Sequence, residues 1–303
     1  MIPRYIISAI FALVFALAII LPRTQLNVPT FSKTLPKVEA AKSSIGIYPV
    51  PMGNFQNAPE TSARAVYIID IKSGVALFEK NPNLKHLPAS TTKLMTALIT
   101  LEKCSPETVI TVGQVQKVGN QMNLEAGDQV TVENLLYGLL IKSGNDAAYA
   151  LANACAQNYQ KFIEAMNEKA KALDMPNTHF ANPAGYDDAL QFSTASDLAK
   201  LARVAVGNPL IAKIVSTKST VVTNISGNKN YYLENVNELL GKVDGVEGIK
   251  TGQTEGAQEI LITETERQGN SIIIALLGST DRFRESQQLI EWAFANYQWV
   301  FAK

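Results

Sequence analysis

The sequence predicts an α/β fold of the α+β kind, with an antiparallel sheet flanked by helices and a helical subdomain inserted at about 94–216. Runs rich in β-branched residues lie at both ends of the folded part, whereas apolar residues between them recur at helical spacing. The composition agrees, because 47% hydrophobic and 18% charged residues among 303 are enough for a substantial core. A cleft between the sheet and the inserted helices is the expected place for a substrate.

The first 22 residues are predicted to be a membrane anchor or a signal peptide. Residues 5–21 are almost wholly apolar and are flanked by Arg4 and Arg23. A run of ~17 residues is at the short end for spanning a bilayer, and it also suits the apolar region of a secretory signal. No small-x-small cleavage site follows promptly, which favours an uncleaved anchor. Both interpretations place the rest of the chain outside the cytoplasm.

Residues 23–61 are predicted to be a linker between this segment and the folded part. Prolines recur from Pro22 to Pro59 without apolar periodicity, which indicates an extended, semi-rigid tether. A single catalytic domain is therefore expected at 62–303.

The folded part is expected to begin with a hairpin, whose strands at 65–71 and 75–79 flank a Lys-Ser-Gly turn. Apolar periodicity then predicts helices, with one short extended piece near 109–112, at 91–103, 132–141, 145–157, 159–173, 195–206 and 208–214. β-branched runs predict a second hairpin at 219–224 and 229–233 and two further strands at 259–264 and 271–277. A last helix is expected at about 281–298.

Charge and residue counts exclude several classes of function. Lysine plus arginine and aspartate plus glutamate both number 27, so no global field indicates a nucleic-acid partner. The histidines, His86 and His179, form no HExxH motif and argue against a zinc peptidase, and no G-x-S-x-G elbow supports a Ser-His-Asp hydrolase. Cys104 and Cys155 could pair or remain thiols, and the alanines around Cys155 favour buried thiols.

One short stretch could hold a nucleophile and its base. Residues 88–93 lead into an apolar run with helical spacing, so Ser90 is expected near the first turn of a helix, with Lys93 on the same face. A buried lysine has a lowered pKa and can take the proton of a serine hydroxyl. The start of a helix also offers free N–H groups that can stabilise an oxyanion. Taken alone, a serine at this position is more often a helix N-cap.

Two further motifs sit where a cleft could gather them. Ser143 lies between two expected helices and could shuttle a proton, while Asn145 could bind a peptide carbonyl. Lys250 offers a charge to a carboxylate and Thr251 offers a hydroxyl, while Gly252 would let a substrate backbone come close. Alone, the first motif is an ordinary capping loop and the second an ordinary turn leading to the strand at 259.

A decoy in the chain shows why context matters. Residues 226–229 satisfy both Ser-x-x-Lys and Ser-x-Asn. They lie between two β-rich runs, so a hairpin turn is the simplest interpretation. Ser226 is therefore not taken as a nucleophile.

In this order, Ser-x-x-Lys, Ser-x-Asn and Lys-Thr-Gly form a pattern of penicillin-binding proteins and class A β-lactamases. Over about 62–298 the chain resembles the low-molecular-weight penicillin-binding proteins of the D-alanyl-D-alanine carboxypeptidase family. Four stretches carry this resemblance besides the three motifs: 88–90, 182–186, 196–199 and 244–250. The resemblance implies the three-layer β-lactamase/transpeptidase fold.

The resemblance also implies the role of each residue in the site. Ser90 would be the acyl-ester nucleophile, Lys93 the proton acceptor and Ser143 a proton relay. The substrate-binding residues would be Asn145, Lys250, Thr251, Gly252 and Gln253. The backbone N–H groups of Ser90 and Gln253 would form the oxyanion hole. No metal or cofactor is implied.

The implied activity is removal of the terminal D-Ala from peptidoglycan stem pentapeptides in the bacterial cell envelope, with β-lactams as covalent inhibitors. The alternative is a D-alanyl-D-alanine endopeptidase that cleaves cross-links. A β-lactamase would need a carboxylate to activate the deacylating water, and none is evident; a non-catalytic penicillin-binding sensor or wall tether would not need an intact set of motifs. Longer family members carry a β-rich domain and a C-terminal amphipathic helix, so here the N-terminal segment would serve as the anchor.

Overall fold

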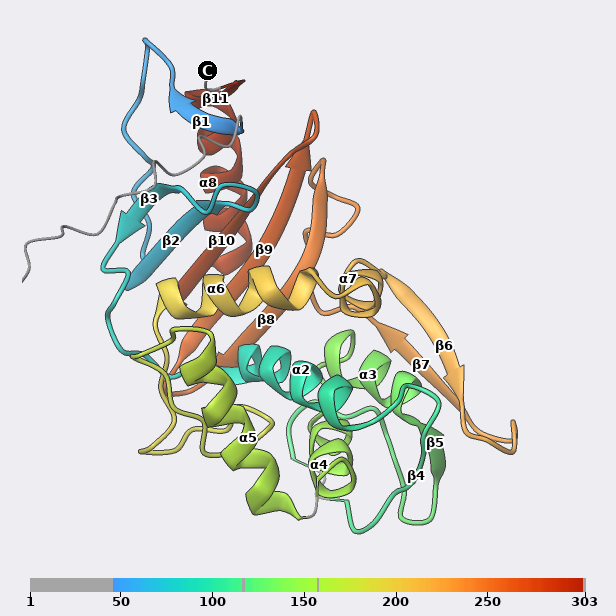
Figure 1. Ribbon diagram of the computed structural model, residues 1–303. Coiled ribbons are helices and arrows are strands. Elements are labelled where there is room, and N and C mark those ends of the chain that lie inside the picture. Colours follow the sequence, from blue (N-terminus) through green and yellow to red (C-terminus); the bar gives the residue numbers. More distant parts are fainter. Residues whose placement is uncertain (1–45, 116–117, 157, 302–303) are drawn as a thin grey trace, which may run out of the picture. The chain divides into compact units, whose positions relative to one another are not determined.

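A five-stranded antiparallel sheet forms the centre of the molecule, whose computed structural model describes residues 46–301 apart from 116, 117 and 157 (Figure 1). The spatial order is β3-β2-β10-β9-β8, so β3 and β8 are the two edges. The strands are β2 (Ala65–Asp70), β3 (Ala76–Lys80), β8 (Val246–Thr254), β9 (Gln258–Arg267) and β10 (Asn270–Ser279). The predicted first hairpin and the two strands near 259 and 271 are confirmed.

Both faces of the sheet are covered, which makes the fold three-layered. Along β10, Ile273, Ala275 and Leu277 belong to one apolar cluster, while Ile272, Ile274 and Leu276 belong to the other. Alternate residues of a strand point to opposite faces, so this strand is apolar throughout because neither face meets water. Helix α8 (Arg282–Asn296) packs against β9 and β10, and α6 (Ala195–Val206) packs against β2 and β10 (Figure 1).

The helical part lies between β3 and β8 in the sequence. It contains η1 (Ala89–Thr92), α2 (Lys93–Lys103), α3 (Val132–Leu140), α4 (Asn145–Ala154), α5 (Tyr159–Ala172), α6 and α7 (Pro209–Val215), with the short pair β4 (Val109–Thr111) and β5 (Gln129–Thr131) and the hairpin of β6 (Ser219–Thr223) and β7 (Asn230–Glu234). Side chains that accept from backbone N–H groups begin four of the helices: Thr131, Asn158, Thr194 and Asn208. The predicted helices are confirmed to within a few residues at their ends.

Helix α2 is the central helix of this part. Every residue from Lys93 to Thr100 is buried. A helix that is buried all round must lie inside the subdomain. Contacts with α3, α4, α5 and α6 provide the surrounding layer.

The two ends of the described chain pair with each other, contrary to prediction. β1 (Ile47–Pro51) lies in the predicted linker, and β11 (Tyr297–Phe301) follows α8, which ends two residues before the predicted helix does. The two strands are antiparallel, with Tyr48 opposite Val300. Phe55 also packs edge-on against Trp292. The linker prediction is therefore wrong over 47–51, because the pairing partner lies some 250 residues away and local periodicity does not reveal it.

The predicted N-terminal anchor at 5–21 and the linker up to residue 45 lie outside the described residues. Among the helices that the structure does describe, none is both long enough and apolar enough to cross a membrane.

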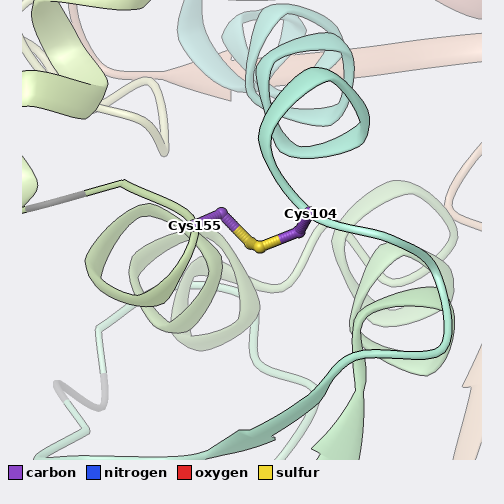
Figure 2. The surroundings of a disulfide bond; sticks show 2 residues. All are labelled: Cys104 and Cys155. Atoms are coloured by element: carbon purple, nitrogen blue, oxygen red, sulfur yellow. A yellow bond between two sulfur atoms is a disulfide. The ribbon is translucent and has the colours of Figure 1, made fainter.

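The interpretation of the two cysteines as thiols is wrong, because Cys104 and Cys155 form a disulfide (Figure 2). Cys104 directly follows α2 and Cys155 directly follows α4. These helices pack against each other, so their ends bring the two Cα atoms to 5.5 Å, a usual separation for a disulfide. The alanines around Cys155 do indicate helix packing. However, α4 packs against α2, and this packing brings Cys155 close to Cys104.

We predict that the double variant Cys104→Ala/Cys155→Ala has a lower free energy of unfolding. The disulfide joins residues 51 positions apart, and constraining a loop of that size contributes roughly 2–4 kcal/mol. The melting temperature should fall by roughly 5–15 °C. Dithiothreitol should lower the melting temperature of the wild type to that of the variant and leave the variant unchanged. A wild type insensitive to reductant would contradict the prediction.

Candidate active site

Ser90 lies in the 3-10 turn η1 and Lys93 is the first residue of α2, as the sequence predicts. The two side chains meet, with Lys93 Nζ 3.0 Å from Ser90 Oγ. The turn is closely covered by Gly185, whose φ is +92°. A Cβ on Gly185 would lie 1.8 Å from the carbonyl oxygen of Ala89, so only glycine allows this approach to the residue before Ser90.

The amine of Lys93 is fully buried among oxygen atoms. Besides Ser90 Oγ, its Nζ lies 2.7 Å from Asn145 Oδ1 and 2.6 Å from the carbonyl oxygen of Ala184. Burial lowers the pKa of Lys93 well below its usual value, and the positive charge of Lys250 adds to this, with Asp146 acting in the opposite sense. The neutral amine is therefore much more accessible than in an ordinary lysine.

The three oxygen neighbours decide how a neutral Lys93 is oriented. An amide carbonyl can only accept, so Asn145 Oδ1 and the Ala184 oxygen take the two hydrogens of the NH₂ group. The lone pair that is left points to the third neighbour, Ser90 Oγ. This arrangement can remove the serine proton and so generate a nucleophile.

Ser143 and Lys250 form a second buried pair beside the first. Lys250 Nζ donates to Ser143 Oγ at 2.9 Å and to the carbonyl oxygen of Thr251 at 2.9 Å. Burial, together with the positive charge of Arg282, lowers the pKa of Lys250 to about 7. A carboxylate arriving next to Lys250 would favour its charged form.

The Lys-Thr-Gly motif lies within β8 rather than in a turn before a strand. β8 is an edge strand, and it packs against η1. A Cβ on Gly252 would lie 3.2 Å from the backbone nitrogen of Ser90. Glycine at this position therefore lets the strand approach the serine, and an extended ligand could lie along the edge.

The predicted residues converge on one cavity of about 400 Å³. Six of the eight line it: Ser90, Ser143, Asn145, Thr251, Gly252 and Gln253. The other two, Lys93 and Lys250, are buried and reach the cavity through their contacts with Ser90 and Ser143. The structure thus brings all eight together, although they come from three separate stretches of the chain.

The residues set aside in the sequence lie elsewhere in the fold. Ser226 occupies the turn between β6 and β7, where its hydroxyl donates to Asn228 Oδ1. His86 is buried in a bridge to Ser193, and His179 stacks on Phe192. Neither histidine lines the cavity that holds Ser90.

Arg282 and Tyr186 are two of the cavity residues that were not predicted from the sequence. Arg282 at the start of α8 donates to the carbonyl oxygen of Gly252 at 3.0 Å and brings a second cation to the β8 side. Tyr186 donates to the carbonyl oxygen of Val118, which also accepts from Asn145 Nδ2. Arg282 has no local motif around it. Tyr186 is the last residue of the 182–186 stretch, which carries part of the family resemblance but implied no role for the tyrosine.

The fold defines the class of protein first. A penicillin-binding protein homologue from Mycobacterium tuberculosis has a TM-score of 0.76 at 30% identity, covering 81% of this chain and 96% of that one. The Streptomyces K15 DD-transpeptidase has a TM-score of 0.74 at 30% identity, covering 79% and 100%. The fold is therefore that of the penicillin-binding DD-peptidases, as the resemblance implied.

The amino-acid sequence then identifies the family within this class. The profile of the D-alanyl-D-alanine carboxypeptidase family matches residues 52–281, and the chain belongs to this family. DacF of Bacillus subtilis is 33% identical over 247 residues, which cover 78% of this chain and 63% of DacF. DacC of Escherichia coli is 35% identical over 263 residues, covering 80% and 64%. The chain thus spans slightly less than two thirds of these two relatives.

We predict that Lys250→Met unfolds less readily than the wild type at neutral pH. The pKa of Lys250 is about 7 in the folded chain against its ordinary value of 10.5, so between these two pH values the unfolded chain binds more protons. Wild-type stability should therefore rise relative to the variant from about pH 7 to pH 10, by at most roughly 1.4 kcal/mol per pH unit. Chemical denaturation across this range measures the difference. A difference independent of pH would contradict the assigned pKa.

Proposed function

We propose that this chain is a serine-type D-Ala-D-Ala carboxypeptidase that removes the terminal D-Ala from peptidoglycan stem pentapeptides. The observation that carries the proposal is the buried Lys93 amine, which two carbonyl acceptors orient toward Ser90 Oγ. Membership of the D-alanyl-D-alanine carboxypeptidase family supports the substrate.

In the proposed acylation, Ser90 Oγ attacks the carbonyl carbon of the penultimate D-Ala while its proton passes to Lys93. The N–H groups of Ser90 and Gln253 stabilise the oxyanion. As the C–N bond breaks, the leaving amine of the terminal D-Ala takes a proton through Ser143, and the acyl group remains as an ester on Ser90. Water then attacks the ester and restores the free serine.

The substrate would lie along the edge of β8. We assign its terminal carboxylate to Lys250 and Thr251, with the charge of Arg282 nearby. Asn145 would bind a peptide carbonyl, since an amide NH₂ has two hydrogens and Val118 takes one of them. Gly252 leaves room for the substrate backbone. A β-lactam would bind in the same way and acylate Ser90 more durably.

The proposed place of action is the bacterial cell envelope, outside the cytoplasm. The Cys104–Cys155 disulfide supports it, because disulfides persist in oxidising compartments. Residues 1–22 would anchor the chain to the membrane or direct its export, and a linker would join them to the catalytic domain.

An endopeptidase that splits D-alanyl cross-links remains the second candidate, because it uses the same acyl-serine chemistry. The purified full-length chain should be given a pentapeptide muropeptide and a cross-linked dimer, with products followed by mass spectrometry. Loss of one D-Ala from the monomer supports the carboxypeptidase. Splitting of the dimer with an untouched pentapeptide would replace it by the endopeptidase.

We predict that Ser90→Ala abolishes covalent labelling by a fluorescent penicillin, because Ser90 is the one hydroxyl that contacts the Lys93 amine in the described part of the chain. Labelling is read from a denaturing gel. Ser226→Ala is the matched control, since Ser226 has the same Ser-x-x-Lys spacing in a hairpin turn and should label like the wild type. Covalent labelling of the Ser90→Ala variant would contradict the assignment of Ser90 as the nucleophile.

We predict that Lys250→Met weakens turnover of peptides with a free C-terminal carboxylate far more than turnover of amidated peptides. The loss of one buried charge-assisted contact should reduce kcat/KM for the free acid by roughly 10–100-fold. Lys242→Met is the control, because Lys242 is exposed and pairs with Glu238. Equal losses for both substrates would argue against the carboxylate role.

A further inference from the structure

The segment 181–186 forms the wall of the site behind Ser90 and belongs to no helix or strand. Within the described part of the chain, no backbone N–H or C=O group of this segment forms a hydrogen bond with another backbone group. Two of its carbonyl groups nevertheless make short contacts with α2. Thr96 Oγ1 donates to Pro183 O at 2.7 Å, and Lys93 Nζ donates to Ala184 O at 2.6 Å.

The side chain of Asn182 provides one support of this segment. Its Oδ1 accepts from the backbone N–H groups of Gly185 at 2.8 Å and of Tyr186 at 3.0 Å. Its Nδ2 donates to the carbonyl oxygen of Tyr186 at 3.1 Å. Asn182 is only 8% exposed, so water competes little for these groups. The turn that carries Ala184 is therefore closed by one side-chain amide.

The side chain of Gln191 provides the second support of this segment. It is 1% exposed, and its Oε1 accepts from the N–H groups of Ala181 at 2.9 Å and Asn182 at 3.0 Å. Its Nε2 lies 3.3 Å from Tyr186 O and 3.4 Å from Thr92 Oγ1. Gln191 thus connects both ends of the segment to the turn between Ser90 and Lys93.

We propose that Asn182 and Gln191 are positioning residues for the base Lys93. They hold the Ala184 carbonyl where it takes one hydrogen of the amine, and this leaves the lone pair directed at Ser90. Neither side chain lines the cavity, so both act through Ala184. The inference rests on the proposed function, in which Lys93 deprotonates Ser90. Without this support, the amine can rotate and present a hydrogen to the serine instead.

The test is the acylation of the full-length protein by a fluorescent penicillin at several concentrations. This separates the limiting acylation rate from the dissociation constant of the non-covalent complex. We expect Gln191→Met and Asn182→Ala to lower the limiting rate by roughly 10–100-fold, as for a displaced catalytic group. The dissociation constant should change by less than about threefold, because Lys250 and Thr251 are untouched.

Asn167→Ala is the matched control. Asn167 holds the same stretch of chain in the same manner, with its side-chain amide bonded to the N–H and C=O groups of Phe180 at 2.8 Å each. Its side chain makes no hydrogen bond to the segment 181–186 itself. Its variant should lose stability and keep its limiting rate within about threefold of the wild type, because it leaves the base in place.

Thr96→Val tests the same inference with less risk to folding, since it preserves the shape of a buried side chain and removes only the donor to Pro183 O. We expect its limiting rate to fall by roughly 3–10-fold. Limiting rates equal to the wild type in the folded variants, or an equal fall in Asn167→Ala, would overturn the inference. A wild type that is not acylated at all would contradict the proposed function instead.

Discussion

The burial of the Lys93 amine is the constraint on which the rest of the site depends. An ammonium group at this depth would be expensive, so the fold favours the neutral amine, and a second buried cation at Lys250 adds to the effect. The oxygen atoms around Lys93 are carbonyl and hydroxyl groups rather than carboxylates. They satisfy the hydrogens of the amine without holding it in the charged form.

This requirement explains why several layers of the fold meet at one helix end. The interior helix α2 places Lys93 where water does not reach, and α4 brings Asn145 beside it. The edge strand β8 approaches the serine from the other side through Gly252. An edge strand has unpaired backbone groups, so the same sheet that forms the core also leaves an edge along which an extended peptide could bind.

Sequence reasoning predicted most of the secondary structure, and the eight residues that it singled out lie together at one cavity, because periodicity and short motifs are local signals. It missed β8 as a strand, since Gly248 and Gly252 within it suggest a turn. It also missed the pairing of β1 with β11 and the partner of Cys104, which depend on residues far apart in the chain. Arg282 was not predicted as a cavity residue, because only the fold brings the start of α8 to the end of β8.

The disulfide has a mechanical consequence for the two helices that it joins. Lys93 and Asn145 begin α2 and α4, and Cys104 and Cys155 follow their last residues. One contact therefore closes each end of the helix pair: a hydrogen bond at the site and a covalent bond about 16 Å away, given 1.5 Å per residue. A pair fastened at both ends is expected to move as one unit. Any widening of the cleft is then expected in the other parts of its lining, which include residues 119–120, the 181–186 segment and β8.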